Sequence, residues 1–250
     1  MDRFLVVGEI CKDEFVYGDV PRICPESPVP VFVPIEKKEN DGMGGNVVNN
    51  IKSINPHAEV IHWHQSVPIT KTRLVEKKSN QMLVRIDEGD NKCDRLEYLS
   101  LAMIQTIGDS DCVIISDYNK GFLDEKIIIE ISKYAKLTIL DSKRKITDTL
   151  IENIDFIKLN KHEWENNKDV VSQRPEKFLI TLGYEGVKHM ENIYPSPRPL
   201  ETIDVSGAGD TFVAGFATKY LLTKSISESL EFANEMASIV VAKKGVSTPF

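Results

Sequence analysis

Short apolar runs recur along the chain and alternate with longer amphipathic segments. The runs are almost free of polar side chains, as is typical of strands in a parallel sheet covered on both faces. They are Phe4–Val7, Val113–Ser116, Leu137–Leu140, Phe156–Leu159 and Phe178–Thr181. Helical spacing is found at Asn46–Ile54, Arg95–Ile107, Asp124–Tyr134, Ala208–Leu222 and Ser227–Val241. This alternation predicts an α/β fold with an open, doubly wound sheet.

Two segments break the alternation. Residues 14–36 carry five of the twelve prolines, and residues 72–87 have the pattern of two strands joined by a polar turn. Proline within a strand favours the edge of a sheet. We therefore expect these segments to form a small β-sheet that stands off the main domain. With no repeat or linker visible, residues 1–250 are expected to form one domain with this appendage.

Composition narrows the class of protein. The chain has 250 residues, a net charge of −7 and 41% hydrophobic residues, and the acidic balance argues against a nucleic-acid partner. Uninterrupted apolar runs are far shorter than the roughly 20 residues of a membrane span, so no membrane partner is expected. The N-terminal MDRFLVVGEICKDE regains charge too soon for a signal peptide, and the four cysteines form no CxxC pair. We expect a cytoplasmic protein with reduced thiols.

The strongest chemical signal is DVSGAGDTF at residues 204–212, where a glycine-rich turn opens directly onto an apolar helix. Such a turn exposes backbone N–H groups, and the helix dipole adds positive potential, so the segment predicts an anion site. A carboxylate at that place, Asp210, makes chemical sense if it takes a proton from a hydroxyl that attacks a phosphate. The alternative is a structural turn with an ordinary aspartate in the first helical turn.

Other polar features are weaker when taken singly. In DGMGGNVVNNI, Asn46 offers a donor and an acceptor to sugar hydroxyls, but asparagine is also a common helix N-cap. His62 and His64 flank Trp63, and since no third ligand is suitably spaced we favour strand packing over a metal site. The chain has neither a GxxxxGK[ST] phosphate loop nor a complete GxGxxG motif, so ATP would need a different cradle.

These motifs together resemble the ribokinase-like (phosphofructokinase-B type) carbohydrate kinases. DVSGAGDTF is similar to that family's D-T-x-G-A-G-D signature, with Val205 where threonine is common. The resemblance implies a three-layer α/β/α sandwich with a small β-sheet lid. It also implies that Asp210 is the catalytic base and that the amides of Gly207, Ala208 and Gly209 form the anion hole. For the sugar site it implies the residues Asp13, Gly42, Gly44, Gly45 and Asn46.

The same resemblance implies a nucleotide site. LITLGYEG is similar to the family's T-x-G-x-x-G element, which implies Thr181, Gly183 and Gly186 near ATP. Asn160 and Glu163 have the N-x-x-E spacing associated with Mg²⁺, held through water, although a solvated polar turn is the alternative. The helix FANEMASIVVAKKG implies that Asn234 contacts the adenine, and a monovalent cation is expected near Asp204.

A narrower resemblance concerns bacterial kinases of D-glycero-β-D-manno-heptose 7-phosphate. RICPESPVPV, ITKTRLVEKKSNQMLVRID, ISDYNKGFL and LDSKR are similar to segments of those enzymes. This implies that Asp117 binds substrate and that six cations face a phosphorylated sugar and ATP. They are Arg22, Lys71, Arg73, Arg85, Lys120 and Lys143. Since a phosphate needs only a few strong donors, we keep solvated surface charge as the alternative for about half of them.

The expected reaction is ATP-dependent phosphorylation of the heptose at its anomeric 1-hydroxyl. Two alternatives stay open: another carbohydrate or nucleoside kinase of this fold, or a catalytically idle relative that binds a sugar phosphate. Residues 56–69 and 166–177 are shorter than the family pattern, which leaves specificity and activity open. A lid-to-lid homodimer is expected, because a projecting sheet would expose apolar side chains. These are Val29, Val31, Val33, Leu74, Leu83 and Ile86.

Overall fold

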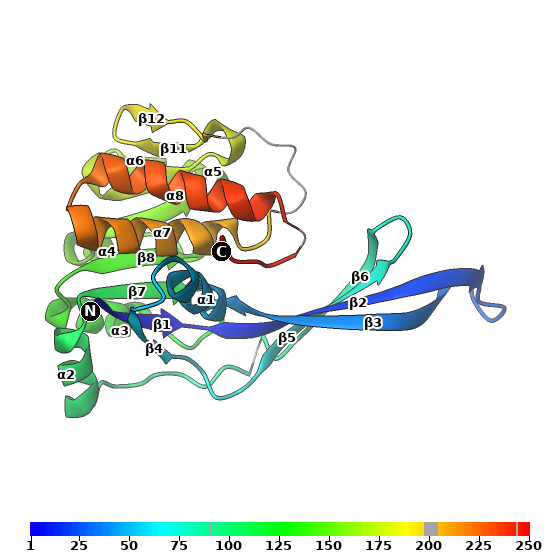
Figure 1. Ribbon diagram of the computed structural model, residues 1–250. Helices are drawn as coiled ribbons and strands as arrows, with labels where there is room; N and C mark the ends of the chain where they lie inside the picture. The colour runs from blue at the N-terminus through cyan, green and yellow to red at the C-terminus, as the bar shows by residue number, and fades with distance from the viewer. Residues whose placement is uncertain (91, 198–204, 244) are drawn as a thin grey trace.

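The computed structural model describes residues 1–90, 92–197, 205–243 and 245–250, and within them eight strands form one sheet in the order β12-β11-β10-β9-β8-β7-β1-β4 (Figure 1). The strands β10, β9, β8, β7, β1 and β4 run parallel to one another. The last two strands, β11 and β12, are antiparallel to their neighbours. The bounds are β1 Arg3–Gly8, β4 Glu59–Trp63, β7 Cys112–Asp117, β8 Thr138–Ser142, β9 Phe156–Asn160, β10 Phe178–Thr181, β11 Val187–His189 and β12 Asn192–Tyr194.

Helices cover both faces of this sheet, and the side chains of β1 show why. Phe4 and Val6 point into one apolar cluster while Leu5 and Val7 point into the other, and all four are fully buried. A strand buried on both faces reads as a continuous apolar run. One layer holds α1 Gly44–Ile54, α7 Ala208–Thr223 and α8 Ile226–Val241. The other holds α2 Leu101–Asp109, α3 Glu125–Tyr134, α4 Asp148–Asn153, α5 Lys161–Glu165 and α6 Lys168–Val171. The predicted three-layer α/β/α sandwich is confirmed.

The helix predicted over Arg95–Ile107 is wrong in its first half. The α2 helix begins at Leu101, where the Ser100 side chain accepts a hydrogen bond from the Met103 amide. Residues 92–100 form no helix. A tertiary contact competes with helix formation here, since the Asp94 carboxylate accepts the backbone N–H groups of Ser66 and Val67. Of the two shortened segments, residues 56–69 contain β4 and the first residue of β5, and residues 166–177 contain α6 and a 3₁₀ turn, Pro175–Lys177.

A second sheet projects from the body (Figure 1). Its order is β3-β2-β5-β6, with β2 parallel to β5 and the outer pairs antiparallel. The bounds are β2 Ile10–Ile23, β3 Pro30–Met43, β5 Ile69–Glu76 and β6 Gln81–Glu88. The strands thus extend beyond residues 14–36 and 72–87 toward the body. Glu9 alone separates β1 from β2, so the chain passes directly from the main sheet into this small sheet.

Candidate active site

The first turn of α7 forms the centre of the site. Gly207 precedes the helix with a φ of 81°, a left-handed conformation that glycine adopts without strain. Within the described residues no side chain caps this helix end, and Gly207, Ala208 and Gly209 line the adjoining cavity. The Ala208 N–H is an exception to the expected anion hole, because it donates to the Val205 carbonyl at 3.3 Å. The candidate anion hole therefore consists of the Gly207 and Gly209 amides.

Asp210 lies in the same turn and is 5% exposed. Its Oδ2 accepts a hydrogen bond from Asn46 Nδ2 at 2.9 Å, and its Oδ1 accepts one from the Tyr118 hydroxyl at 2.9 Å. Burial raises the pKa of Asp210 to about 6, and the neighbouring Asp141 adds to this effect. The Asn46 and Tyr118 hydrogen bonds and the Lys158 charge oppose the rise. Near neutral pH the carboxylate is ionised and close to the pKa expected of a general base.

A buried ion pair lies beneath this turn and was not predicted from the sequence. Lys158 Nζ contacts both oxygens of Asp141, at 3.0 and 3.2 Å, and both side chains are almost fully buried. Burial alone would lower the pKa of Lys158, but Asp141 and Glu163 outweigh it and raise the pKa. A methyl group on Gly209 would lie 2.8 Å from Lys158 Nζ, so the cation sits directly against the anion hole. The available signal was one lysine within the apolar strand FIKLN.

A cavity of about 760 Å³ opens from this turn between α7, α8 and the ends of β8 to β10, within the size range of small-molecule sites. Six of the predicted nucleotide-binding residues line it: Lys143, Asn160, Thr181, Gly183, Gly186 and Asn234. The 3₁₀ turn Gly183–Glu185 forms part of its wall. The Asn234 amide nitrogen is already committed, since it donates to the Tyr194 carbonyl at 2.8 Å. The carbonyl oxygen of that side chain is the group left for a ligand.

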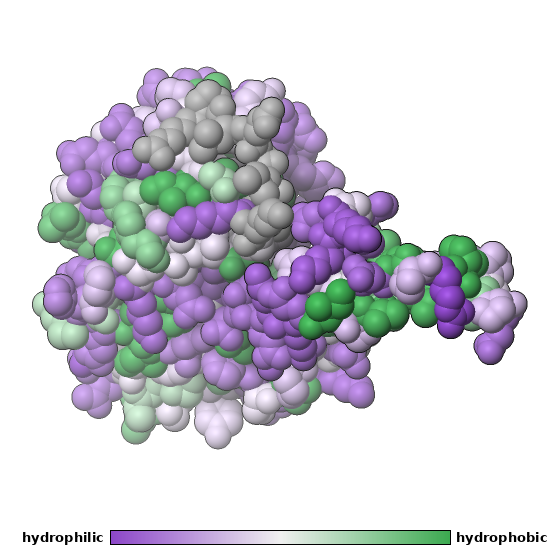
Figure 2. All heavy atoms as spheres, turned by 45° about the vertical axis from the view of Figure 1, so that its right-hand side comes forward, coloured by the Kyte–Doolittle hydropathy of each residue, from purple (hydrophilic) through white to green (hydrophobic). Residues whose placement is uncertain are grey.

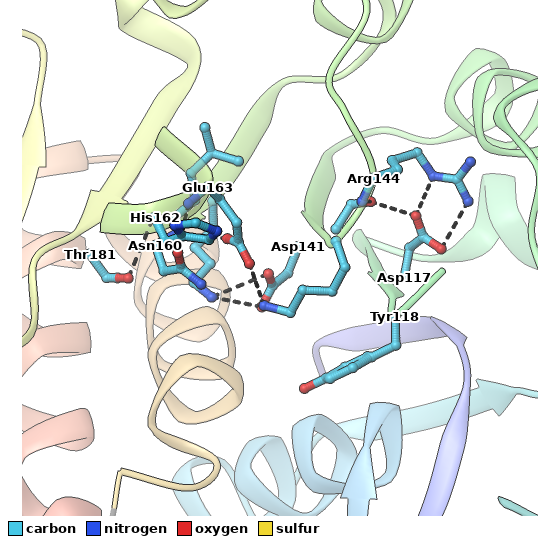
Figure 3. Close-up of polar contacts among 12 residues, drawn as sticks. Asp117, Tyr118, Asp141, Arg144, Asn160, His162, Glu163 and Thr181 are labelled. Atoms are coloured by element: carbon cyan, nitrogen blue, oxygen red, sulfur yellow. Dashed lines mark hydrogen bonds and ion pairs between the residues drawn. The ribbon is translucent and has the colours of Figure 1, made fainter. Parts of the chain in front are cut away.

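Asn160 and Glu163 form a capping box on α5 (Figure 3). Asn160 Oδ1 accepts the Glu163 amide at 2.8 Å, and Glu163 Oε2 accepts the Asn160 amide at 2.7 Å. The other Glu163 oxygen contacts Lys143 Nζ at 2.5 Å. Both side chains are therefore engaged with the protein. Among the described residues there is no group of three or more acidic, cysteine or histidine side chains arranged to hold a metal ion.

The small sheet supplies the opposite side of the site. Asp13 is 5% exposed and forms an ion pair with Arg73 Nη1 at 2.6 Å. Gly42 allows this packing, because a side chain there would begin 2.1 Å from Asp13 Oδ2. Lys71 Nζ lies 5.9 Å from the centre of the Tyr118 ring. These contacts bring predicted sugar-site residues close to Asp210.

The turn at the end of β3 places its left-handed backbone conformation on a residue other than glycine. The positive φ of 56° falls on Met43 and not on Gly42, Gly44 or Gly45. Met43 is 3% exposed and packs with Cys11 and Ile69, so buried contacts hold a conformation that is strained for a residue with a side chain.

Asp117, which was predicted to bind substrate, is engaged with other groups of the protein. It is fully buried, and its oxygens accept hydrogen bonds from Ser142, from the Asn119 amide and from the Arg144 guanidinium (Figure 3). With its acceptor sites occupied, it holds the loop after β7 in place. Lys120, in that loop, forms an ion pair with Asp90.

One predicted cation lies far from Asp13 in a single chain. Arg22 is nine residues beyond Asp13 on β2, which at the usual strand rise is about 30 Å. Arg85 is exposed on β6, directly opposite Arg73 in the pairing of β5 with β6, and forms an ion pair with Asp87 at 2.9 Å. The rings of His62 and His64 lie 4.8 Å apart on and just after β4, and a methyl group on Gly44 would lie 2.8 Å from His62 Nε2. Asp204 lies outside the described residues.

Comparison with known proteins agrees with this geometry. Residues 44–250 match the pfkB family of carbohydrate kinases, and the chain belongs to that family. The members of this family are described as carbohydrate kinases, which are phosphotransferases with an alcohol group as acceptor. The described part of the chain contains no helix that is long and apolar enough to span a membrane.

Curated relatives of the chain include several bifunctional HldE proteins. The chain is 30% identical to the bifunctional protein HldE of Helicobacter pylori strain J99 over 299 aligned positions, which cover 98% of this chain and 64% of that protein. It is 27% identical to HldE of an Enterobacter species, again over 98% of this chain and 61% of the relative. The chain therefore spans less than two thirds of these relatives. Since the alignments are longer than the chain, the relatives contain residues with no counterpart here.

Solved structures share the fold at low sequence identity. Arabidopsis thaliana ribokinase, complexed with ribose and ATP, has a TM-score of 0.74 at 18% identity and covers 98% of this chain and 94% of its own. Escherichia coli phosphofructokinase-2, complexed with potassium, has a TM-score of 0.72 at 16% identity, covering 99% and 95% respectively.

Proposed function

We propose that this kinase uses ATP and Mg²⁺ to phosphorylate the anomeric 1-hydroxyl of D-glycero-β-D-manno-heptose 7-phosphate. The observation that carries the reaction is the Asp210 carboxylate beside an uncapped helix N-terminus, at the mouth of a nucleotide-sized cavity. The substrate is supported by the basic residues Lys71 and Arg73 beside Asp13 and by the similarity to HldE proteins.

In the proposed reaction, the sugar 1-hydroxyl gives its proton to Asp210 while its oxygen attacks the γ-phosphorus of ATP. The new O–P bond forms as the bond to the β,γ-bridging oxygen breaks, and ADP leaves with that electron pair. The amides of Gly207 and Gly209 and the charge of Lys158 stabilise the negative charge on the transferring group. Mg²⁺ would offset the charge of the ATP phosphates.

The residues present fit a hydrated cation better than a directly bound one. Asn160 and Glu163 are engaged in the capping box, so they would hold Mg²⁺ through its water molecules. A monovalent cation near Asp204 remains part of the proposal, although that residue lies outside the described residues. A cytoplasmic location is supported by four cysteines that form no disulfide.

The test is an ATP-consumption screen with the heptose 7-phosphate, the same heptose without phosphate, ribose, fructose and adenosine. We expect the highest kcat/KM for the heptose 7-phosphate. Lys71→Met should lower kcat/KM for that sugar by tenfold or more and affect the unphosphorylated heptose much less, whereas Lys78→Met at the exposed β5–β6 turn should change neither. A higher kcat/KM with ribose, fructose or adenosine would replace the heptose with that acceptor.

The shortened segments at residues 56–69 and 166–177 favour the alternative, a catalytically idle relative. An ordered base beside an anion hole weighs against it. Tight binding of both ATP and heptose 7-phosphate with no turnover of any sugar would establish the idle relative instead.

We also propose that two copies pair through the small sheet. Seven large apolar side chains on this sheet are exposed, and Figure 2 shows apolar patches along its length. They are Ile23, Val29, Val33, Ile35, Met82, Val84 and Ile86. Of the residues predicted from the sequence, Val31, Leu74 and Leu83 are half-buried. An exposed apolar surface of this kind favours a partner, and a two-fold pair is the commonest one.

Pairing would also give Arg22 a role. It lies about 30 Å from Asp13 of its own chain, and two sheets packed face to face would bring the far end of one toward the body of the other. Light scattering tests the pair: Val31→Asp and Val84→Asp should yield monomers with reduced turnover. Leu101→Asp, an exposed apolar position on the body, should stay paired and active. A fully active wild-type monomer at micromolar concentration would contradict this proposal.

A further inference from the structure

Tyr118 lies between the two halves of the site, and the motifs assign it no role. Its hydroxyl donates to Asp210 Oδ1 at 2.9 Å. Its ring centre lies 5.9 Å from Lys71 Nζ on the small sheet and 5.8 Å from Lys143 Nζ in the nucleotide cavity. In Figure 3 the phenol extends away from the Asp117–Arg144 pair. Tyr118 therefore contacts the candidate base from the junction of the acceptor and nucleotide sides.

The backbone around Tyr118 is held by a buried carboxylate. Glu9 is fully buried and accepts the amides of Tyr118 at 2.8 Å, Lys120 at 3.0 Å and Phe122 at 3.3 Å. On the other side, the Tyr118 ring packs against the cluster of Cys11, Met43 and Ile69. Contacts from both sheets thus fix the direction of the phenol, so the hydrogen bond to Asp210 does not depend on a loose side chain.

We propose that Tyr118 is a positioning residue for the base: its hydroxyl fixes Asp210 from the Oδ1 side, opposite Asn46, and keeps it in the form that accepts a proton. This inference rests on the proposed role of Asp210. An ionised carboxylate has about four acceptor sites, so two fixed donors leave room for an incoming sugar hydroxyl. The two donors define which directions remain open.

The charged groups around Asp210 show why this donor matters. Asp141 at the end of β8 disfavours the ionised carboxylate, and Lys158 on β9 favours it. Cys11 on β2 stays a neutral thiol, because burial raises its pKa to about 12. Burial likewise raises the pKa of Tyr118 well above its usual value, so the phenol keeps its proton and donates. Losing the hydroxyl would leave Asn46 as the single side-chain hydrogen-bond donor recorded for Asp210 among the described residues.

The test compares Tyr118→Phe with Tyr98→Phe, a matched control at an exposed position. Carboxyl ¹³C NMR of aspartate-labelled protein follows Asp210, whose signal is assigned by its absence from Asp210→Asn. The midpoint of its titration should rise by about one pH unit in Tyr118→Phe, as expected for losing a hydrogen bond to a charged group, and stay unchanged in Tyr98→Phe. The acid limb of kcat/KM should move by the same amount, with most activity recovered at pH 8.

A second sample tests the same hydrogen bond in case Tyr118→Phe does not fold. Replacing tyrosine with 3-fluorotyrosine makes the phenol a stronger donor and should lower the Asp210 midpoint. An unchanged midpoint in both samples, or an equal loss of kcat/KM at every pH, would overturn the inference. If the wild-type protein phosphorylates no sugar, the proposed function fails, while the NMR midpoint still decides whether Tyr118 controls Asp210.

Discussion

Replacing Asp210 by asparagine should change stability in a way that reverses sign with pH. Burial raises the pKa of this carboxyl from an ordinary 3.8 to about 6. A group whose folded pKa is raised contributes stability that is fully present below the unfolded pKa and is lost as pH rises through the folded pKa. The wild-type protein therefore loses stability between about pH 4 and pH 7, as the buried carboxylate ionises, whereas the asparagine variant does not.

The magnitude follows from the two pKa values. A difference of about two pH units corresponds to about 3 kcal/mol, of which roughly half is lost above pH 5. Asparagine has one acceptor oxygen where aspartate has two, so one of the hydrogen bonds from Asn46 and Tyr118 is lost at every pH, at about 1–2 kcal/mol. Asp210→Asn should thus be less stable than wild type below pH 4.5 and equally or more stable at pH 7.5.

Urea unfolding of both proteins between about pH 3.5 and pH 8 measures this difference, with Asp169→Asn at an exposed position as the control. Turnover of Asp210→Asn should fall by roughly 10²–10⁴-fold, the range for losing a general base. A stability difference that stays constant with pH would refute the reasoning, because it would mean that burial does not penalise the Asp210 charge. Near-normal turnover would remove Asp210 from the mechanism.

Further predictions concern the same site. Since Asp210 must be ionised and its pKa is about 6, kcat/KM should fall about tenfold per pH unit below pH 6 and level off above pH 7; a flat profile down to pH 5 would contradict this. Gly209→Ala would place a methyl group 2.8 Å from Lys158 Nζ and should lower kcat at least tenfold, whereas Gly108→Ala, with its nearest neighbour at 3.9 Å, should leave kcat unchanged. Lys158→Met leaves Asp141 buried without its partner and should cost about 3–5 kcal/mol in urea unfolding; a cost below 1 kcal/mol would show that the pair is solvated.

The sequence was informative wherever structure and chemistry depend on neighbouring residues. Each central strand is buried on both faces, so its apolar run is visible without any tertiary information. The Gly207–Asp210 turn is likewise contiguous, and its glycines and carboxylate are placed by one helix start. The structure brings this turn to the cavity that also contains the predicted nucleotide-site residues Thr181 and Asn234.

Side chains whose surroundings come from other strands could not be predicted in this way. Asp117 looks available in ISDYNKG, but Ser142 at the end of the next strand and Arg144 just after it occupy its oxygens. Asp141 and Lys158 meet because β8 and β9 are neighbours in the sheet, which no local pattern encodes. The helix expected from Arg95 onward begins only at Leu101, because the Asp94 carboxylate is hydrogen-bonded to residues 66–67.

The composition of the small sheet's two edges has a consequence for how the molecule can aggregate. Within the part of the chain that the structure describes, the outer strands β3 and β6 have no neighbour on one side, and such an edge can pair with a strand of another chain. On β3, Pro30 and Pro34 lack the N–H donors that such pairing requires, and the run from Glu36 to Glu39 is charged throughout. On β6, Arg85 and Asp87 place charge along the opposite edge. Strand-by-strand growth into fibres is thus disfavoured at both edges, and the proposed face-to-face pairing of two copies would cover the exposed apolar side chains without leaving an edge for further growth.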